Sequence, residues 1–424
     1  MRTPIFALTA LSLAIASPAM AQMKTPATPA APAAPAAPAA ADSRDAGITS
    51  STGAGGRSIT AFDRKAQTRV GGYFDIEFAQ PLNGKNSSFS QHRLILQASS
   101  YLHENLFFNT EIEYEYGGLI NALTRDGELK IEQAWADYQI SEAFNWRSGV
   151  MLIPFGIVNI LHDSDVRETT ARPLMASTIT PTTWMEAGTG FHGVFYPTED
   201  MMLSYETYVT NGLNNQISPS NGLRNARPSL KADNNGNKAI SGRLGISPWL
   251  GWEVGLSGYT AEYDAANTKR LSMVGVDNTL TLGPVEIVGE YANAMTQGGT
   301  FTTTTTTTPL TGNVTAATTT TTIPGSMEGW YVEGRYRFFP EFLHNTFLGR
   351  GGGFDQATLT LVGRYGQADT NQQANDASNK TEALVGINYR PIQTFVTKLE
   401  WQRIAEPVTG KSDDAILSSV AVGF

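Results

Sequence analysis

The sequence predicts an all-β protein, a transmembrane antiparallel β-barrel of about 16 strands. Segments of strand length with alternating apolar and polar residues follow one another along most of the chain. The connections between them alternate between short turns and long polar loops, which is typical of a barrel with two different ends. After the N-terminal region there is no continuous apolar run of ~18 residues, which excludes a helical membrane protein.

Residues 1–21 are predicted to be a secretory signal peptide. Arg2 supplies a positive charge, residues 5–16 form an apolar core, and residues 19–21 (Ala-Met-Ala) form a small-residue cleavage site. An exported barrel of this kind is expected in the outer membrane of a Gram-negative bacterium. The chain contains no cysteine, which excludes a disulfide scaffold, a thiol enzyme and a cysteine-based metal site.

Residues 22–68 are predicted to be a periplasmic linker without stable structure. Residues 27–41 are an Ala/Pro tract, whose prolines favour an extended spacer. Residues 42–68 are polar and rich in Gly and Ser, with no sustained periodicity. The barrel domain is therefore expected to occupy residues 69–424.

The composition suits strands that face lipid on one side and water on the other. Hydrophobic residues make up 41% of the chain and charged residues only 16%, with 41 glycines. The formal net charge of −9 argues against a nucleic-acid partner. It does not indicate which ions cross the barrel, because the charges of loops and lumen are summed together.

Alternation and turn residues define the strands one by one. Tight turns such as 103–105, 283–284 and 392–393 separate neighbouring strands. The predicted strands are 69–79, 89–102, 106–117, 129–140, 144–154, 187–196, 201–212, 237–248, 252–262, 270–282, 285–295, 327–338, 356–366, 380–391, 394–406 and 413–424. The Thr-rich connection 296–326 is expected to be a polar loop outside the cell. The Gly-rich connection 339–355 is long although it falls on the side of the short turns.

Charged residues identify the strand faces that line the lumen. In the segment 106–117, Glu111 and Glu113 alternate with Ile112 and Tyr114. Arg or Lys on the lipid face would cost ~2–4 kcal/mol near the bilayer midplane, so the charged face is predicted to be the inner one. The predicted lumen residues are Arg93, Glu111, Glu113, Arg147, Glu206, Arg243, Arg335, Arg337, Arg364 and Arg390.

The last ten residues, 415–424, alternate small and apolar side chains and stop on Phe424. This ending resembles the last strand of bacterial outer-membrane barrels, whose terminal Phe resembles the signal that the barrel-insertion machinery reads. The resemblance implies that machinery as a partner. Outer-membrane lipid and lipopolysaccharide are expected to surround the barrel.

Three stretches resemble the phosphate-selective porin O and P family. They are residues 147–159 (Arg-Ser-Gly-Val-Met-Leu-Ile-Pro-Phe-Gly-Ile-Val-Asn), 132–138 (Glu-Gln-Ala-Trp-Ala-Asp-Tyr) and 188–193 (Gly-Thr-Gly-Phe-His-Gly). The resemblance implies a homotrimeric porin of about 16 strands, whose long third loop folds into the lumen and narrows it. Here that loop is 155–186, and its charged residues form the expected constriction: Asp163, Asp165, Arg167, Glu168 and Arg172.

Phosphate-selective members are expected to carry an arginine ladder and a lysine cluster, and here no lysine lies between Lys130 and Lys231. The sequence therefore predicts a porin for passive diffusion of ions and small hydrophilic solutes, with an anion- or phosphate-selective channel as the alternative. Arg167 and Arg172 either set up a transverse field or pin the loop to the wall. A barrel enzyme ranks below, because no histidine lies beside a nucleophile signature. A surface adhesin also ranks below, because the Thr-rich tract is explained by a solvated loop. No cofactor and no metal site is predicted.

Overall fold

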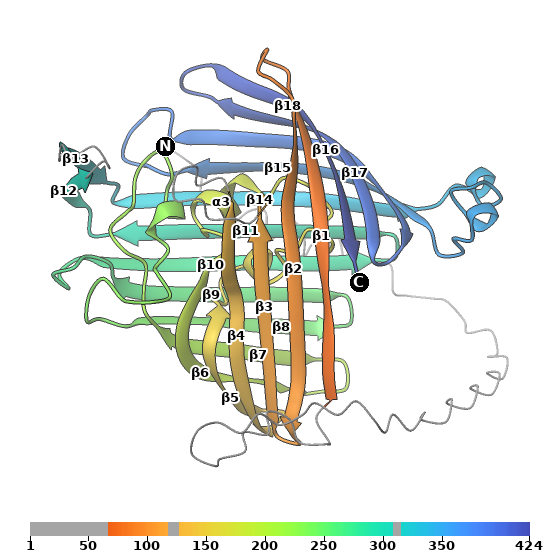
Figure 1. The fold of residues 1–424 in the computed structure, drawn as a ribbon, viewed down its shortest axis with the longest axis horizontal. Helices are drawn as coiled ribbons and strands as arrows, with labels where there is room; N and C mark the ends of the chain where they lie inside the picture. Colours follow the sequence, from red (N-terminus) through yellow and green to blue (C-terminus); the bar gives the residue numbers. More distant parts are fainter. Residues whose placement is uncertain (1–66, 118–126, 308–314) are drawn as a thin grey trace, which may run out of the picture. The chain divides into compact units, whose positions relative to one another are not determined.

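In the computed structural model, which describes residues 67–117, 127–307 and 315–424, 16 antiparallel strands close into a barrel (Figure 1). The barrel strands are β1 (Gln67–Pro81), β2 (Ser88–His103), β3 (Leu106–Glu115), β4 (Glu128–Ser141), β5 (Phe144–Leu152), β6 (Met185–Phe195), β7 (Met202–Thr210), β8 (Ala239–Trp249), β9 (Trp252–Glu262), β10 (Arg270–Leu282), β11 (Val285–Thr296), β14 (Ser326–Phe338), β15 (Thr358–Asp369), β16 (Asn379–Ile392), β17 (Phe395–Glu406) and β18 (Lys411–Gly423). Their bounds lie within a few residues of the predicted ones, and the predicted fold class is confirmed. The predicted signal peptide and nearly all of the predicted linker lie outside the described residues and stay predictions.

The barrel closes where β18 pairs with β1. Tyr73 lies opposite Gly423 in this register, and the main chains of Gly72 and Phe424 exchange hydrogen bonds of 3.1 and 2.9 Å. Gly72 has a φ of 157°, and a Cβ there would lie 2.0 Å from the carbonyl oxygen of Ile95. Only glycine therefore fits at this point of closure.

The Thr-rich connection, predicted to be a polar loop, is paired within itself. Its residues form a separate two-stranded hairpin of β12 (Gly299–Thr307) and β13 (Thr315–Ile323), outside the ring of barrel strands. In the ring itself β11 pairs directly with β14. Threonine is β-branched and suits extended backbone, which explains why a polar tract forms strands here.

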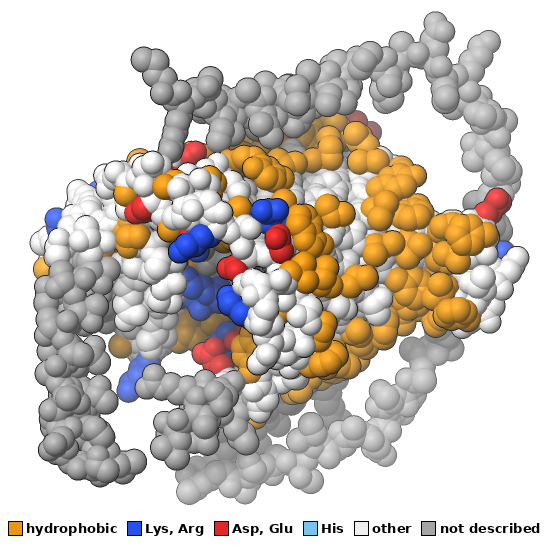
Figure 2. Space-filling model, turned by 90° about the horizontal axis from the view of Figure 1, so that it is seen from above, with side chains coloured by type: hydrophobic (Ala, Val, Ile, Leu, Met, Phe, Trp, Pro, Cys, Tyr) orange, Lys and Arg blue, Asp and Glu red, His pale blue; other side chains and the backbone are white. Residues whose placement is uncertain are grey.

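Each strand presents a polar face to the interior and an apolar face to the outside. On β3, Glu111 and Glu113 are buried while Ile112 between them is exposed. Val385 and Leu399 on neighbouring strands are exposed in the same way. Apolar side chains accordingly cover broad areas of the outer wall in Figure 2. This distribution is the one that a lipid-embedded barrel requires.

In the part of the chain that the structure describes, three connections carry short helices. The β5–β6 loop, residues 153–184, contains α2 (Ile157–Ile160) and α3 (Leu174–Thr178), and the β7–β8 loop, residues 211–238, contains η1 (Arg224–Ala226). The Gly-rich connection after β14 is folded and contains η2 (Glu341–Leu343) and η3 (Arg350–Gly352). Within the described ranges no helix is long and apolar enough to cross a membrane.

An apolar core lies between the β5–β6 loop and the barrel strands. The loop contributes Phe155, Met175 and Trp184 to it, all buried. The ring of Trp184 meets that of Tyr259 on β9 edge-on, with centroids 4.7 Å apart. The loop is thus held by hydrophobic packing on one side of the interior, and polar contacts hold the other side.

Candidate functional site

The β5–β6 loop is hydrogen-bonded to inward-facing side chains of the strands β15, β16 and β17. Lys398 Nζ donates to the carbonyl oxygen of Ser164 over 2.6 Å, and Arg364 Nη1 donates to Thr169 Oγ1 over 2.9 Å. The backbone N–H of Thr170 donates to the Glu400 carboxylate. Because β15–β17 lie far from β5 and β6 in the ring, these bonds tie the loop to a distant part of the wall.

Glu168, one of the acidic residues of the predicted constriction, faces this wall. Glu168 lies 3.5 Å from both Arg337 and Arg390 and accepts a hydrogen bond of 2.9 Å from Asn388 Nδ2. Burial opposes ionisation of Glu168, but Arg390 and Arg335 outweigh it and hold its pKa below the usual range. Each of these contacts attaches the loop to the barrel.

The two other predicted acids of the loop are less enclosed. Asp163 Oδ1 accepts a hydrogen bond of 3.1 Å from the Tyr73 hydroxyl. The carbonyl of Asp165 accepts one of 2.9 Å from Arg390, while burial and the Asp163 charge raise the pKa of the Asp165 carboxyl. Neither acid faces Arg167 or Arg172 in an ion pair among the described residues.

The two predicted arginines of the loop bind backbone and hydroxyl oxygens. Arg167 donates to the carbonyls of Thr169 and Thr170 over 3.2 and 2.7 Å and to Ser164 Oγ over 3.0 Å. Arg172 donates to the carbonyl of Thr182 over 3.1 Å. These bonds order the loop and leave both positive charges without a carboxylate partner among the described residues.

The two guanidinium groups line a cavity of about 420 Å³ in the barrel interior. Arg224 from the β7–β8 loop lines the same cavity, and Glu77 of β1 and His92 of β2 line it as well. We call Arg167, Arg172 and Arg224 the arginine cluster. Figure 2 shows basic and acidic side chains gathered in a hollow of the barrel.

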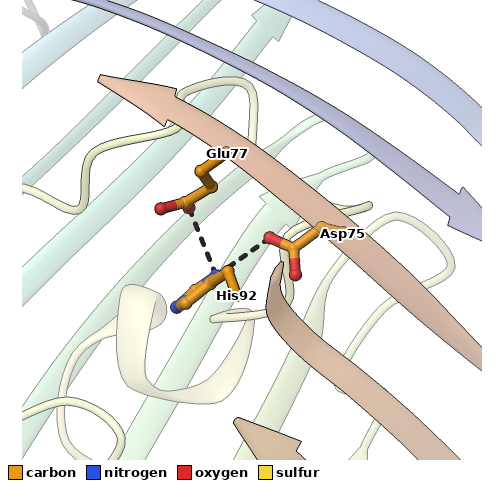
Figure 3. Close-up of side chains that lie close together, drawn as sticks. All are labelled: Asp75, Glu77 and His92. Atoms are coloured by element: carbon orange, nitrogen blue, oxygen red, sulfur yellow. Dashed lines mark hydrogen bonds and ion pairs between the residues drawn. The ribbon is translucent and has the colours of Figure 1, made fainter. Parts of the chain in front are cut away.

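The side of the cavity formed by β1 and β2 carries an acid–histidine group of Asp75, Glu77 and His92, of which Glu77 and His92 line the cavity (Figure 3). His92 Nδ1 lies 2.9 Å from Asp75 Oδ2 and 3.2 Å from Glu77 Oε1. The other oxygen of Asp75 accepts a hydrogen bond of 2.8 Å from the backbone N–H of Arg93. A proton on Nδ1 satisfies both carboxylates, so this group holds Glu77 in place at the cavity.

All ten predicted lumen residues belong to polar networks of the inner wall, and the arginines among them are paired with carboxylates. Arg147 lies 2.7 Å from Asp137, Arg243 lies 2.6 Å from Asp277, and Arg364 lies 2.8 Å from Glu382. The remaining contacts are Arg93 with Glu113, Arg335 with Glu286 and Glu333, Arg337 with Glu286, Arg390 with Glu168, Glu111 with Gln133, and Glu206 with Tyr208. The wall arginines are therefore neutralised by carboxylates of the wall or, for Arg390, by Glu168 of the loop, in contrast to the arginine cluster.

A family model for phosphate-selective porin O and P matches residues 65–401. The chain belongs to this family. It is an outer-membrane porin of a Gram-negative bacterium, and it lets ions and small hydrophilic solutes diffuse passively. Family and fold are those of a channel rather than an enzyme.

A relative and several solved structures resemble the porin. An uncharacterized protein of Aquifex aeolicus is 27% identical over 387 residues, which cover 86% of this chain and 81% of the relative. The anion-selective porin from Comamonas acidovorans has a TM-score of 0.52 at 10% identity, over 85% of this chain and 100% of that one. The channel DcaP of Acinetobacter baumannii has a TM-score of 0.52 at 12% identity, over 86% and 98% of the two chains. At these identities the solved structures show the fold alone.

Among the residues at the cavity that sequence reasoning did not identify are His92 and Arg224. The predicted alternation, with Arg93 facing inward, places its neighbour His92 outward, but β2 has a bulge there: Asp75 pairs with Arg93 and Ile76 with Gln91. The bulge turns His92 to the interior. Arg224 lies in a long loop, where no periodicity indicates orientation.

Burial and nearby positive charges lower the pKa of two arginines, one in the β5–β6 loop and one in the β7–β8 loop. Burial and the nearby Arg93 and Arg167 lower the pKa of Arg172 to about 9. Burial and Arg224 lower the pKa of Arg227 to about 10. Both values remain above neutrality, so the guanidinium groups carry their charge at pH 7.

Proposed function

We propose that the porin prefers anions and that the arginine cluster sets this preference. The observation that carries the proposal is that three arginines line one cavity without a carboxylate partner among the described residues, while the wall arginines are paired. Charged side chains at a narrow point of a pore select ions through their field. An anion entering the cavity would meet guanidinium groups from two loops.

The proposal requires that the β5–β6 loop narrows the lumen. The hydrogen bonds from Lys398 and Arg364 to this loop, and the packing of Trp184 against Tyr259, support that role. Inorganic phosphate is the anion to test first, because the family is described as phosphate-selective. Arg binds phosphate oxygens in a bidentate manner, which suits a site with several guanidinium groups.

Glu77 opposes the arginine cluster across the same cavity. A carboxylate facing guanidinium groups produces a transverse field, as the sequence suggests for other residues of the loop. Here the acidic side of the field comes from β1 and not from Asp163, Asp165 or Glu168. This arrangement favours a moderate anion preference over an exclusive one.

The test is single-channel recording of the purified porin in a planar bilayer under a KCl gradient. The wild type should show an anion-directed reversal potential, and added phosphate should reduce the chloride current. The double variant Arg172→Gln/Arg224→Gln should shift the reversal potential toward zero. Arg270→Gln, which removes an exposed arginine at the end of β10, should leave it unchanged.

Arg172→Lys separates the field from the structural role of this residue. Lysine keeps the charge but cannot reproduce the planar set of guanidinium donors. Retained anion preference in Arg172→Lys supports the field. A zero or cation-directed reversal potential in the wild type would overturn the anion preference and leave a general porin.

A homotrimer is proposed from the family resemblance alone. The porin in detergent should have three times the mass of one chain by light scattering. A monomer that conducts with the same selectivity would contradict the trimer and leave the pore proposal intact.

A further inference from the structure

A second acid–histidine group lies between the β5–β6 loop and the wall, and none of its three residues lines the cavity. It consists of Glu111 on β3, Glu132 on β4 and His162 of the loop. Their side chains are buried, with exposed fractions of 3%, 0% and 1%. One donor atom from each residue lies within 4.8 Å of the other two.

A β-bulge creates this group. Glu111 pairs with Gln133, but the next residue, Ile112, pairs with Ile131, which leaves Glu132 as the extra residue of β4. The bulge breaks the alternation of the strand and turns the Glu132 side chain to the interior beside Glu111. Two carboxylates from adjacent strands are thus brought together under the loop.

The hydrogen bonds of His162 determine which ring nitrogen faces the carboxylates. His162 Nδ1 lies 3.1 Å from the carbonyl oxygen of Asn159, which can only accept, so Nδ1 carries the proton. Nε2 lies 3.2 Å from Glu132 Oε1 and 3.6 Å from Asp163 Oδ1. An Nδ1–H bonded to a backbone carbonyl is the orientation that presents Nε2 as a metal ligand. Nε2 here needs either a second proton or a cation.

Several oxygens of the group have no donor. Glu111 Oε1 and Glu132 Oε2 accept no hydrogen bond from any described residue. Glu111 Oε2 accepts one from Gln133 Nε2 over 2.7 Å, and Glu132 Oε1 lies 4.0 Å from Arg93 Nη1. Buried ionised carboxylates without partners are strongly unfavourable, so these oxygens need a proton or a cation.

The nearby cations are already engaged by other carboxylates. Arg93 Nε and Lys130 Nζ each lie 2.7 Å from Glu113, and Arg93 Nη2 lies 3.2 Å from Glu115. Arg93 also reaches Glu132 Oε1 over 4.0 Å, so Arg93 and Lys130 are shared among Glu113, Glu115 and Glu132, while Glu111 has no ion pair among the described residues. The carboxylates of this buried space thus outnumber the Arg and Lys cations.

We propose that Glu111, Glu132 and His162 bind one divalent transition-metal cation, which fastens the β5–β6 loop to β3 and β4. One imidazole nitrogen with two carboxylate oxygens is a donor set for Zn²⁺, Mn²⁺ or Fe²⁺, whereas Ca²⁺ and Mg²⁺ prefer oxygen alone. Zinc bonds of roughly 2.0–2.2 Å place ligands roughly 3.3–3.5 Å apart. A small contraction of the group reaches that separation.

The group of Asp75, Glu77 and His92 in Figure 3 provides the internal comparison. There a single nitrogen, His92 Nδ1, contacts both carboxylates, and one proton satisfies it. In the buried group the proton is on the opposite nitrogen, Nδ1 of His162. The two groups therefore differ in whether a metal ion is needed.

The test uses the mature porin refolded in detergent without lipopolysaccharide and treated with a chelator. Isothermal titration with Zn²⁺, and Co²⁺ titration followed by visible absorption, should both show one ion per chain. His162→Gln should weaken binding about 100-fold or more, because even outer-shell changes typically cost 10–100-fold. His92→Gln and His103→Gln, the latter at the exposed end of β2, should bind like the wild type.

Glu111→Gln provides a second variant if His162→Gln does not fold, and heat-modifiable migration on a gel reports folding of each. The wild type should also be refolded with Zn²⁺ present, so that a closed loop cannot hide the site. Failure to bind under both conditions, or binding that His162→Gln does not weaken, would overturn the proposal. Since the readout is binding, it is independent of ion preference and of the proposed anion selectivity.

Discussion

Asn388 of β16 donates two hydrogen bonds to Glu168 of the β5–β6 loop. Its Nδ2 donates to the Glu168 carbonyl oxygen over 2.6 Å and to the carboxylate over 2.9 Å. Arg390 and Arg337 add charge contacts of 3.5 Å each. An acid that the sequence suggests for the pore field thus attaches the loop to the wall.

Acid should loosen this attachment. The pKa of Glu168 is lowered in the folded protein, so its contribution to stability is present above its ordinary pKa, about 4.3. This contribution is lost as the pH falls through the lower pKa of the folded state. We expect larger and noisier single-channel conductance below about pH 4 than at pH 7. Glu168→Gln should show the same behaviour at pH 7, and a variant identical to wild type at all pH values would contradict this role.

Lys398→Met should release the same side of the loop. The buried ammonium donates to the carbonyls of Ser164 and Thr169 over 2.6 and 3.5 Å. Methionine has a similar length but leaves both carbonyls without this donor, at a cost of about 1–3 kcal/mol. Limited proteolysis should cut the loop faster than in wild type. Lys411→Met, an exposed residue at the start of β18, is the control.

Trp184→Ala should weaken the apolar attachment. The indole is fully buried against Phe155 and Tyr259, and truncation of such a side chain costs about 3–5 kcal/mol. The urea midpoint of refolding into vesicles should fall accordingly. Trp249→Ala, at an exposed β8–β9 turn, should shift it much less. Equal shifts would mean that the loop core does not contribute to barrel stability.

Glu77→Gln should increase anion preference. Glu77 is the carboxylate among the residues that line the 420 Å³ cavity. Removing its charge leaves the field of the arginine cluster unopposed. The reversal potential under a KCl gradient should move further in the anion direction, whereas Glu104→Gln in an exposed turn should not move it. An unchanged reversal potential would show that Glu77 does not act on the permeating ions, and a shift in the cation direction would contradict the proposed field.

Phe424→Ala should affect insertion more than folding. The Phe424 side chain is 64% exposed, while its backbone bonds to Gly72 do not depend on the side chain. We expect normal refolding in detergent but less folded porin in the outer membrane of cells, as measured by heat-modifiable migration. Equal loss in both settings would indicate a packing role in place of a recognition signal.

Much of the barrel could be predicted because the alternation of side chains along each strand shows which face is inside. Glu111 and Glu113 alternate with Ile112, and lipid on one side with water on the other makes this pattern unambiguous. The prediction of a polar loop did not specify the hairpin that the β-branched residues of the Thr-rich connection form. Alternation also misplaces His92 and gives no orientation for Glu132, because a bulge shifts the face of every residue that follows it.

The sequence by itself determined the fold class, the strands, the inward face of the wall and the family resemblance, since each depends on neighbours along the chain. The tertiary structure decided which charges are paired and which remain free. Arg243 and Arg172 look alike in the sequence, yet one meets Asp277 on a strand further along the chain and the other meets only loop oxygens. Pairing depends on register and on where the loop contacts the wall. Those relationships join residues far apart in the chain, and only the closed barrel specifies them.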